Sequence, residues 1–407
     1  MPGPAPPCEA RPPRVASIDW LRGLAMAVML IDHTRDFLLA ETFRHRATDL
    51  SVISSATFLT RWITHFCAPW FVLLAGLAIH FQLQGGRSPA QVRRFLWTRG
   101  LWLVACEFTL VTLGAEFRWS PWTHALLAQV IWVLGVSMVL MAFLVRLPRT
   151  WVLVLALAMV GGHNLLDRIQ VPAWTGGAAM PGPGAALWTV LHQVGLVAPL
   201  GTPYPRVFIL YPVLPWPGVM ALGYALGPLF QAAPDRRRRR LLALGGLAVA
   251  AFVLVRAWLR YGDPAPWAAQ ATPLRTLLSF VNVTKYPPSL LYLLMTLGPG
   301  LLLLAWREGR RETCLDRGLA TLGRVPLFFY LLQWPTAHGL AVLFHALAGK
   351  PWRAVLHLAR PVPADLGFGL GTVYLGWALG LALLYPLCRW YAGIKARHGA
   401  RGWLSYL

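Results

Sequence analysis

The sequence predicts an all-α protein, a polytopic integral membrane helix bundle of about ten transmembrane helices. Three observations carry this prediction. Of the 407 residues, 57% are hydrophobic and only 13% are charged, a composition typical of multi-span membrane proteins. The chain contains 20 Trp residues, a side chain that is enriched where membrane helices meet lipid headgroups. Apolar runs long enough to cross a bilayer also recur along the whole chain.

Ten of these runs reach the length that a helix needs to span the membrane. We place them at residues 17–38, 60–83, 95–115, 124–145, 150–170, 206–231, 241–259, 286–306, 322–347 and 367–388. Together they form one membrane domain over 17–392, between a Pro-rich N-terminal tail (1–16) and a basic C-terminal tail (393–407).

The formal net charge of +22 is distributed in short basic clusters between the apolar runs. These clusters precede the first run, follow the last and occupy every second connection in between, as Arg236 to Arg240 do. The positive-inside rule places basic connections in the cytoplasm, so we expect both termini there. The clusters form no continuous basic patch, which argues against a nucleic-acid partner.

The first run carries charges that no cleavable signal peptide would contain, so we expect it to insert uncleaved. Its residues fall into two groups, one at the cytoplasmic start and one near the outer end. Ionisable side chains at membrane depth are costly and usually face a protein interior or a water-filled cavity. The two groups are Asp19 with Arg22, and Asp32 with His33, Arg35 and Asp36.

Other polar residues are predicted at the same outer level. Arg61 and His65 are four residues apart on the second run and therefore share a helix face. The connection before them and the later runs add further members. Prolines in the second, eighth and ninth runs remove backbone donors, which is tolerated at membrane depth only beside protein or a cavity. We therefore predict an outer cavity; the further members are His45, Asp49, Lys285, Tyr286 and Gln333, and the prolines are Pro69, Pro287, Pro288 and Pro335.

Each charged pair in this group also has a purely structural interpretation, because intramembrane charges pair with one another by default. Arg22 has two alternatives, an ion pair with Asp19 three residues earlier or a contact with a phosphate from the cytosol. A catalytic role is favoured because His33 and His65 are predicted at similar depth with carboxylates nearby, and a catalytic base needs an orienting acid. The five Cys residues form no metal-binding spacing, so we predict no metal and no disulfide.

Four strings of residues resemble a known family. They are Ser17 to Leu24 (SIDWLRGL), Asp32 to Phe37 (DHTRDF), Thr60 to Pro69 (TRWITHFCAP) and Lys285 to Leu290 (KYPPSL). Together they are similar to bacterial membrane proteins of the heparan-alpha-glucosaminide N-acetyltransferase catalytic-domain type, within the wider transmembrane acyltransferase superfamily. The resemblance implies an enzyme that takes an acetyl group from cytosolic acetyl-CoA, its co-substrate. The acceptor would be an amine or hydroxyl on a sugar or envelope component at the outer side.

The resemblance also suggests roles for the polar residues. His65 would act as the base, with Asp36 or Asp32 orienting a histidine and Arg61 or Lys285 near developing negative charge. Arg22 would face the CoA phosphates. His33 and His45 compete with His65 for the catalytic role, and His33 offers a covalent acetyl-histidine relay. Gln333 stands where many bacterial relatives are expected to carry His, which leaves open a catalytically silent protein.

A different function class fits the same residues. A proton-coupled transporter or flippase would use Asp36 and His65 as a proton relay within Pro-broken helices. Against this class, the two halves of the chain show no internal repeat. We expect a multi-pass protein of the bacterial cytoplasmic (inner) membrane whose partners are the lipid bilayer, acyl-CoA and a small-molecule or glycan acceptor. The sequence leaves open whether it forms a homo-oligomer.

Overall fold

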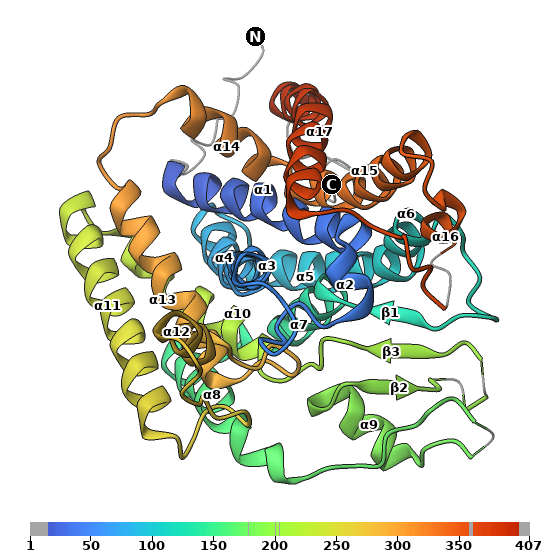
Figure 1. The fold of residues 1–407 in the computed structure, drawn as a ribbon. Coiled ribbons are helices and arrows are strands. Elements are labelled where there is room, and N and C mark those ends of the chain that lie inside the picture. Colours follow the sequence, from blue (N-terminus) through green and yellow to red (C-terminus); the bar gives the residue numbers. More distant parts are fainter. Residues whose placement is uncertain (1–14, 178, 200, 203, 358–360, 399–407) are drawn as a thin grey trace.

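The computed structural model describes residues 15–177, 179–199, 201–202, 204–357 and 361–398. Regular structure in these residues is almost entirely helical (Figure 1), which confirms the all-α prediction. Most of the two predicted tails lies outside the described residues. The last helix continues to His398, past the predicted end of the membrane domain at residue 392.

The helices and strands follow one another along the chain as helical hairpins with one small sheet in the middle. In order they are α1 (Ala16–Leu38), α2 (Ala40–Arg44), α3 (Ser55–Thr64), α4 (Cys67–Gln84), α5 (Pro89–Cys106), the π-helix η1 (Glu107–Val111), α6 (Thr112–Glu116), β1 (Leu126–Ala128), α7 (Val130–Leu144), α8 (Arg149–Gly162), the 3₁₀-helix η2 (His163–Arg168), α9 (Pro183–His192), β2 (Gly195–Val197), β3 (Val207–Ile209), α10 (Trp216–Ala225), the 3₁₀-helix η3 (Gly227–Gln231), α11 (Pro234–Trp258), α12 (Pro273–Val281), α13 (Leu290–Arg307), α14 (Cys314–Arg324), α15 (Pro326–Leu347), α16 (Trp352–Leu356) and α17 (Leu370–His398).

Seven helical segments of the described chain are long and apolar enough to cross a membrane. They are Ser55–Gln84, Pro89–Glu116, Arg149–Arg168, Pro234–Trp258, Leu290–Arg307, Pro326–Leu347 and Leu370–Arg397. Each coincides with one of the ten predicted runs, so the protein is a polytopic membrane protein. The other three runs also coincide with helices, but α1 carries the charges described above, and α7 and α10 are shorter. The count of ten spans and the side of each terminus stay predictions.

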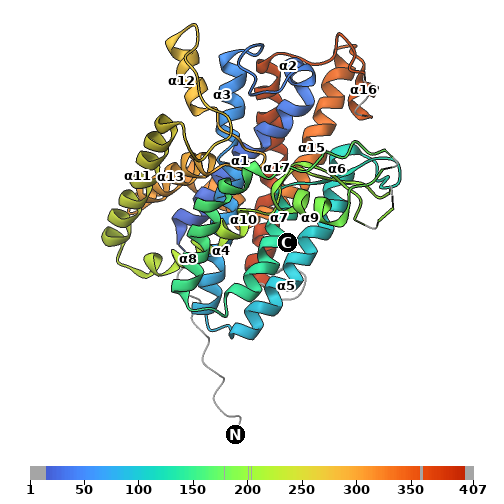
Figure 2. The same cartoon turned by 90° about the horizontal axis from the view of Figure 1, so that it is seen from below.

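Helix α1 lies in the middle of the bundle. It packs against α3, α4, α14, α15 and α17, and Figures 1 and 2 show these helices surrounding it. His33 and Arg35 of α1 are therefore buried in protein, which is the arrangement that intramembrane ionisable groups need. In Figure 2, α2, α3, α12 and α16 lie together at one end of the bundle.

Glycines allow several helices to cross with their backbones in close contact. A Cβ on Gly76 of α4 would lie 1.8 Å from the backbone oxygen of Met220 in α10, and one on Gly23 of α1 would lie 1.8 Å from that of Leu319 in α14. Small residues that allow backbones to approach are the common device for packing helices in a bilayer. These contacts fix the position of α1 and α4, the two helices that flank the polar cavity described below.

Two predicted runs begin with strands instead of helix. β3 pairs in parallel with β1 and antiparallel with β2, with Leu126 opposite Val207 and Gly195 opposite Ile209. Pro212 and Pro215 remove backbone donors just after β3, so helix resumes only at Trp216. The carboxylate of Glu107 accepts a 2.9 Å hydrogen bond from the Trp132 backbone N–H and so satisfies a free donor in the first turn of α7.

Two predictions about prolines require correction. The eighth span does not contain Pro287 and Pro288, because these residues lie in the loop before α13. The hydroxyl of Ser289 accepts a 3.0 Å hydrogen bond from the Tyr292 N–H and starts the helix at Leu290, as Ser does at N-caps. The second run is broken between α3 and α4, and Pro69 lies in the first turn of α4, where a missing donor costs little.

Candidate functional site

A polar cavity of about 1010 Å³ opens where the end of α1 meets α2, α3 and the loop before α13. It brings together residues that are far apart in sequence, since α1, α3 and the loop after α12 all contribute. Nine of the predicted site residues line it: Asp32, His33, Arg35, Asp36, His45, Arg61, His65, Lys285 and Tyr286.

Asp32 is the centre of the charge network in this cavity. Its carboxylate lies 2.7 Å from Nη1 of Arg35 and 2.6 Å from Nη1 of Arg61. The hydroxyl of Thr64 donates a further hydrogen bond to it at 2.8 Å. These partners tie α1 to α3, so Asp32 has the structural role that intramembrane charge pairs adopt by default. Asp36 pairs with Nη2 of Arg35 at 2.6 Å, and its side chain is 48% exposed.

The histidines occupy two different environments. His33 and His65 are buried, and the ring of His33 lies 3.7 Å from that of Trp334, centroid to centroid. In the described part of the chain, no acidic side chain hydrogen-bonds to either ring, and both ring nitrogens of His33 lack a partner. The expected Asp–His pairing is therefore not formed, because Asp32 is already engaged by arginines. His45 is exposed at the rim of the cavity.

Lys285 is a buried cation on the opposite wall. The residue is 7% exposed, and its Nζ lies 5.2 Å from the ring centroid of Tyr286. No carboxylate of the described chain lies within ion-pair distance of this ammonium group. The Tyr286 hydroxyl accepts a 3.2 Å hydrogen bond from Nη2 of Arg61. The cavity wall thus places an unneutralised positive charge beside the histidines, where it would attract an anion or a developing oxyanion.

Asp263, which the sequence did not single out, holds the loop that carries Lys285. Its side chain is buried and accepts hydrogen bonds from the Thr284 N–H at 2.8 Å, the Thr284 hydroxyl at 2.9 Å and the Ser289 hydroxyl at 2.7 Å. The backbone N–H of Ala265 donates to the same carboxylate at 2.9 Å. The signal in the sequence that could have identified Asp263 is the rarity of acidic residues, because the chain has only 15 of them.

Four predicted site residues lie outside this cavity. Arg22 pairs with Asp19 at 3.2 Å near the start of α1. Asp49 lies in an exposed loop, where hydrogen bonds from Ser51 lower the pKa of its carboxyl. Gln333 is fully buried, and its amide contacts the sulfur of Met29 at 3.3 Å.

A second cavity, of about 290 Å³, surrounds the Arg22 end of α1. Two residues, Val130 and Tyr330, line both cavities, so the two spaces are neighbours at these residues. Basic residues from four helices line the second cavity, namely Arg22, Arg99, Arg324 and Lys395. The bundle therefore contains a basic cavity and a histidine-containing cavity that share Val130 and Tyr330 as lining residues.

Comparison with known protein families identifies the family of this chain. A family model described as heparan-alpha-glucosaminide N-acetyltransferase, catalytic, matches residues 14–258, more than half of the chain. The chain belongs to this family. No curated protein matches it.

The heparan-alpha-glucosaminide N-acetyltransferase match confirms the resemblance that the four sequence strings suggested and makes the protein a member of a membrane acetyltransferase family. The matched residues contain His33 of α1, His45 in the loop after α2 and His65 between α3 and α4. Asp263 and Lys285 lie beyond the matched residues, and the tertiary structure brings Lys285 to the same cavity.

Proposed function

We propose that the protein transfers an acetyl group from acetyl-CoA to an amine or hydroxyl acceptor, and that the transfer takes place in the larger cavity. The observation that carries this proposal is the meeting of the two cavities at Val130 and Tyr330. A donor in the basic cavity and an acceptor in the histidine-containing cavity would then approach each other at these two residues.

The basic cavity suits a donor that carries phosphates. Arg22, Arg99 and Arg324 supply guanidinium groups, which bind phosphate oxygens strongly. Arg22 and His33 lie eleven positions apart on α1, a rise of roughly 16 Å along the helix. The donor phosphates and the reacting thioester would therefore lie at different depths, consistent with entry of the donor from one side of the membrane and of the acceptor from the other.

The chemistry requires a base, a stabilised oxyanion and a leaving thiolate. In the direct route, a histidine takes the proton from the acceptor as its nitrogen or oxygen bonds to the acetyl carbon. The C–S bond then breaks, and the CoA thiolate takes the proton from the histidinium, which returns the histidine to its neutral form. We assign the base to His65, and we place the Lys285 ammonium near the oxyanion because it has no carboxylate partner. His33 offers the alternative of a covalent acetyl relay, and His45 stays a candidate at the rim.

A transporter is the second candidate function, because two neighbouring polar cavities within the bundle also fit alternating access. The first experiment therefore measures acetyl-CoA binding to the detergent-purified protein by isothermal titration. Wild type is compared with Arg22→Ala and with Arg146→Ala, an exposed arginine that lines neither cavity. Dephospho-CoA analogues test the role of the phosphates.

Saturable binding that weakens in Arg22→Ala and with fewer donor phosphates, but not in Arg146→Ala, supports the acetyltransferase. Release of the CoA thiol on adding a glucosamine-type acceptor then shows transfer. If folded wild-type protein binds no acetyl-CoA, the acetyltransferase proposal fails, and the transporter or a catalytically silent relative takes its place.

A further inference from the structure

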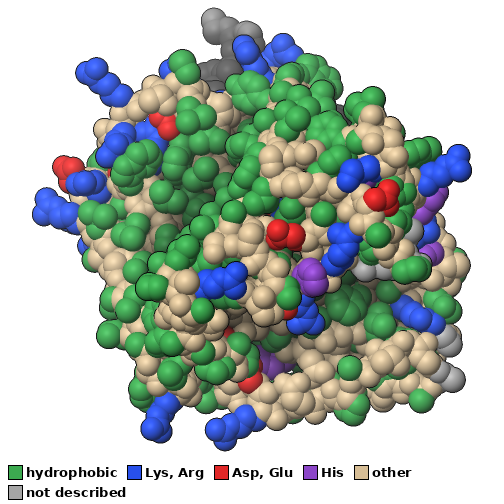
Figure 3. Space-filling view, in the orientation of Figure 1, with side chains coloured by type: hydrophobic (Ala, Val, Ile, Leu, Met, Phe, Trp, Pro, Cys, Tyr) green, Lys and Arg blue, Asp and Glu red, His purple; other side chains and the backbone are tan. Residues whose placement is uncertain are grey.

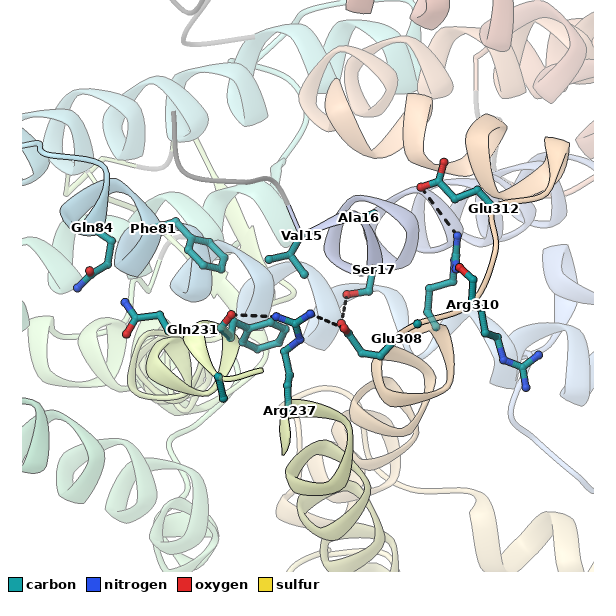
Figure 4. A pocket seen from close by; sticks show the side chains of 14 residues that line it. Val15, Ala16, Ser17, Phe81, Gln84, Gln231, Arg237, Glu308, Arg310 and Glu312 are labelled. Atoms are coloured by element: carbon teal, nitrogen blue, oxygen red, sulfur yellow. Dashed lines mark hydrogen bonds and ion pairs between the residues drawn. The ribbon is translucent and has the colours of Figure 1, made fainter. Parts of the chain in front are cut away.

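A third cavity, of about 600 Å³, lies at the same end of the bundle as the start of α1 and is not part of the proposed reaction path. It is formed by the start of α1, the ends of α4 and α13, η3 and the start of α11. Its lining combines the apolar residues Val15, Phe81 and Phe230 with charged residues that include Arg237, Arg310, Glu308 and Glu312. In Figure 4, Phe81 lies to the left of Arg237, and Glu308, Arg310 and Glu312 lie to its right.

The polar wall is held by a hydrogen-bonded chain. Arg237 of α11 pairs with the carboxylate of Glu308 at the end of α13, and the Ser17 hydroxyl donates to the same carboxylate at 2.8 Å (Figure 4). Arg237 also donates to the backbone oxygen of Phe230 at 3.0 Å. Glu308 is thus satisfied by residues of α1 and α11, and it neutralises Arg237.

The arginines around this cavity, in contrast, outnumber the acids. Six exposed arginine side chains on the first turns of α11 and just after α13 have no carboxylate within ion-pair distance in the described chain. The guanidinium of Arg310 lies over the ring of Trp306, 4.3 Å from its centroid. Blue side chains gather over this region at the upper left of Figure 3. The six are Arg236, Arg238, Arg239, Arg240, Arg310 and Arg311.

The surrounding surface belongs to a lipid boundary. Only 22% of the most apolar window of α11 is buried inside the protein, so most of this helix faces lipid. Trp306, at the end of α13, is 45% exposed, and exposed Trp marks the headgroup level. Unpaired basic residues next to a membrane-spanning helix attract anionic lipid headgroups.

We propose that this cavity, with Arg310 in its lining and the five other exposed arginines in the neighbouring stretches of the chain, forms a binding site for the headgroup of an anionic phospholipid. Arg310 contacts the phosphate, the other arginines add to the positive potential at the headgroup level, and the apolar residues Val15, Phe81 and Phe230 accommodate the glycerol and the first carbons of the acyl chains. The site joins α1, α4, α11 and α13, so a bound lipid holds the outer helix pair against the helices that flank the polar cavity. This function is separate from acetyl transfer.

The test measures binding of the full-length, delipidated protein to mixed micelles that contain either dioleoylphosphatidylglycerol or dioleoylphosphatidylcholine. The test variant is the triple substitution Arg240→Gln, Arg310→Gln and Arg311→Gln. The control, with the same loss of charge, is Arg94→Gln, Arg146→Gln and Arg149→Gln. These arginines are also exposed, and they lie in connections predicted to be on the same side of the membrane. None of them lines this cavity.

We expect saturable binding of phosphatidylglycerol only, weakened about tenfold or more in the test variant and little changed in the control. Thermal unfolding of both variants without lipid shows that they are folded. An equal loss in both triples would overturn the proposal, because the arginines would then act only through net charge. Competition by inorganic phosphate or acetyl-CoA at comparable concentration would also overturn it, in favour of a site for soluble anions.

Discussion

The guanidinium of Arg61 and the carboxylate of Asp32 tie α3 to α1 at the wall of the polar cavity. Nη1 of Arg61 lies 2.6 Å from both carboxylate oxygens, and Arg35 approaches the same carboxylate at 2.7 Å. One acid thus neutralises part of two guanidinium groups. Together with the unpaired ammonium group of Lys285, this pairing leaves the cavity net positive.

Breaking the Asp32–Arg61 pair should destabilise the protein strongly. Removing one partner of a buried pair leaves an uncompensated charge, which costs about 3–5 kcal/mol. We therefore expect Asp32→Asn and Arg61→Gln each to lower the apparent melting temperature in detergent. The melting temperature of the double variant should fall by less than the sum of the two single decreases. Removing both groups leaves neither an unpaired Asp32 carboxylate nor an unpaired Arg61 guanidinium. Additive losses would show that the two residues act independently.

A transfer assay should distinguish the roles of the three candidate histidines. If His65 is the base, His65→Ala lowers the rate of CoA thiol release by about a hundredfold or more, and His45→Ala at the exposed rim has a smaller effect. His33→Ala abolishes transfer only if the acetyl group passes through a covalent relay. His124, which is exposed and does not line the cavity, provides the control His124→Ala. Wild-type rates in both His65→Ala and His33→Ala, with intact protein, would refute the assignment.

Asp263 should act through Lys285. In Asp263→Asn one oxygen acceptor becomes a donor, so the hydrogen bonds from Thr284 and Ser289 cannot all form. We expect kcat to fall by about tenfold, as in Lys285→Ala, and the melting temperature to fall as well, because Asp263 also lies 3.9 Å from the buried guanidinium of Arg256. The variant that combines Asp263→Asn with Lys285→Ala should be no slower than Lys285→Ala alone.

The control for Asp263 is Asp365→Asn, an exposed acid in a later loop. If Asp263 had a purely structural role, the rate effects of Asp263→Asn and Lys285→Ala would instead multiply in the double variant.

The Gly76 crossing should tolerate no side chain. A Cβ at this position would lie 1.8 Å from the Met220 backbone oxygen, so Gly76→Ala forces α4 and α10 apart at a cost of about 1–3 kcal/mol or more. Gly161→Ala in α8 is the matched control, since a Cβ there meets nothing within 4 Å. Its higher helix propensity should leave stability unchanged or slightly raised. Equal melting temperatures for the two variants would contradict the packing argument.

The sequence by itself determined the fold class and most helix positions, because bilayer-length apolar runs have few alternatives to helix. It also located the charged end of α1 and the Arg61–His65 face of the next helical run, since charges in an apolar run stand out without structural information. The family strings pointed to the same segments.

Tertiary structure decided how these residues are paired. Asp32 binds arginines and not histidine, Lys285 comes from a loop and not from a helix, and Asp263 holds that loop from more than twenty positions away. Sequence spacing predicts neighbours on one helix face, but contacts between helices depend on close crossings such as Gly76 against Met220. The same holds for Val130 and Tyr330, which come from separate helices and together line both cavities.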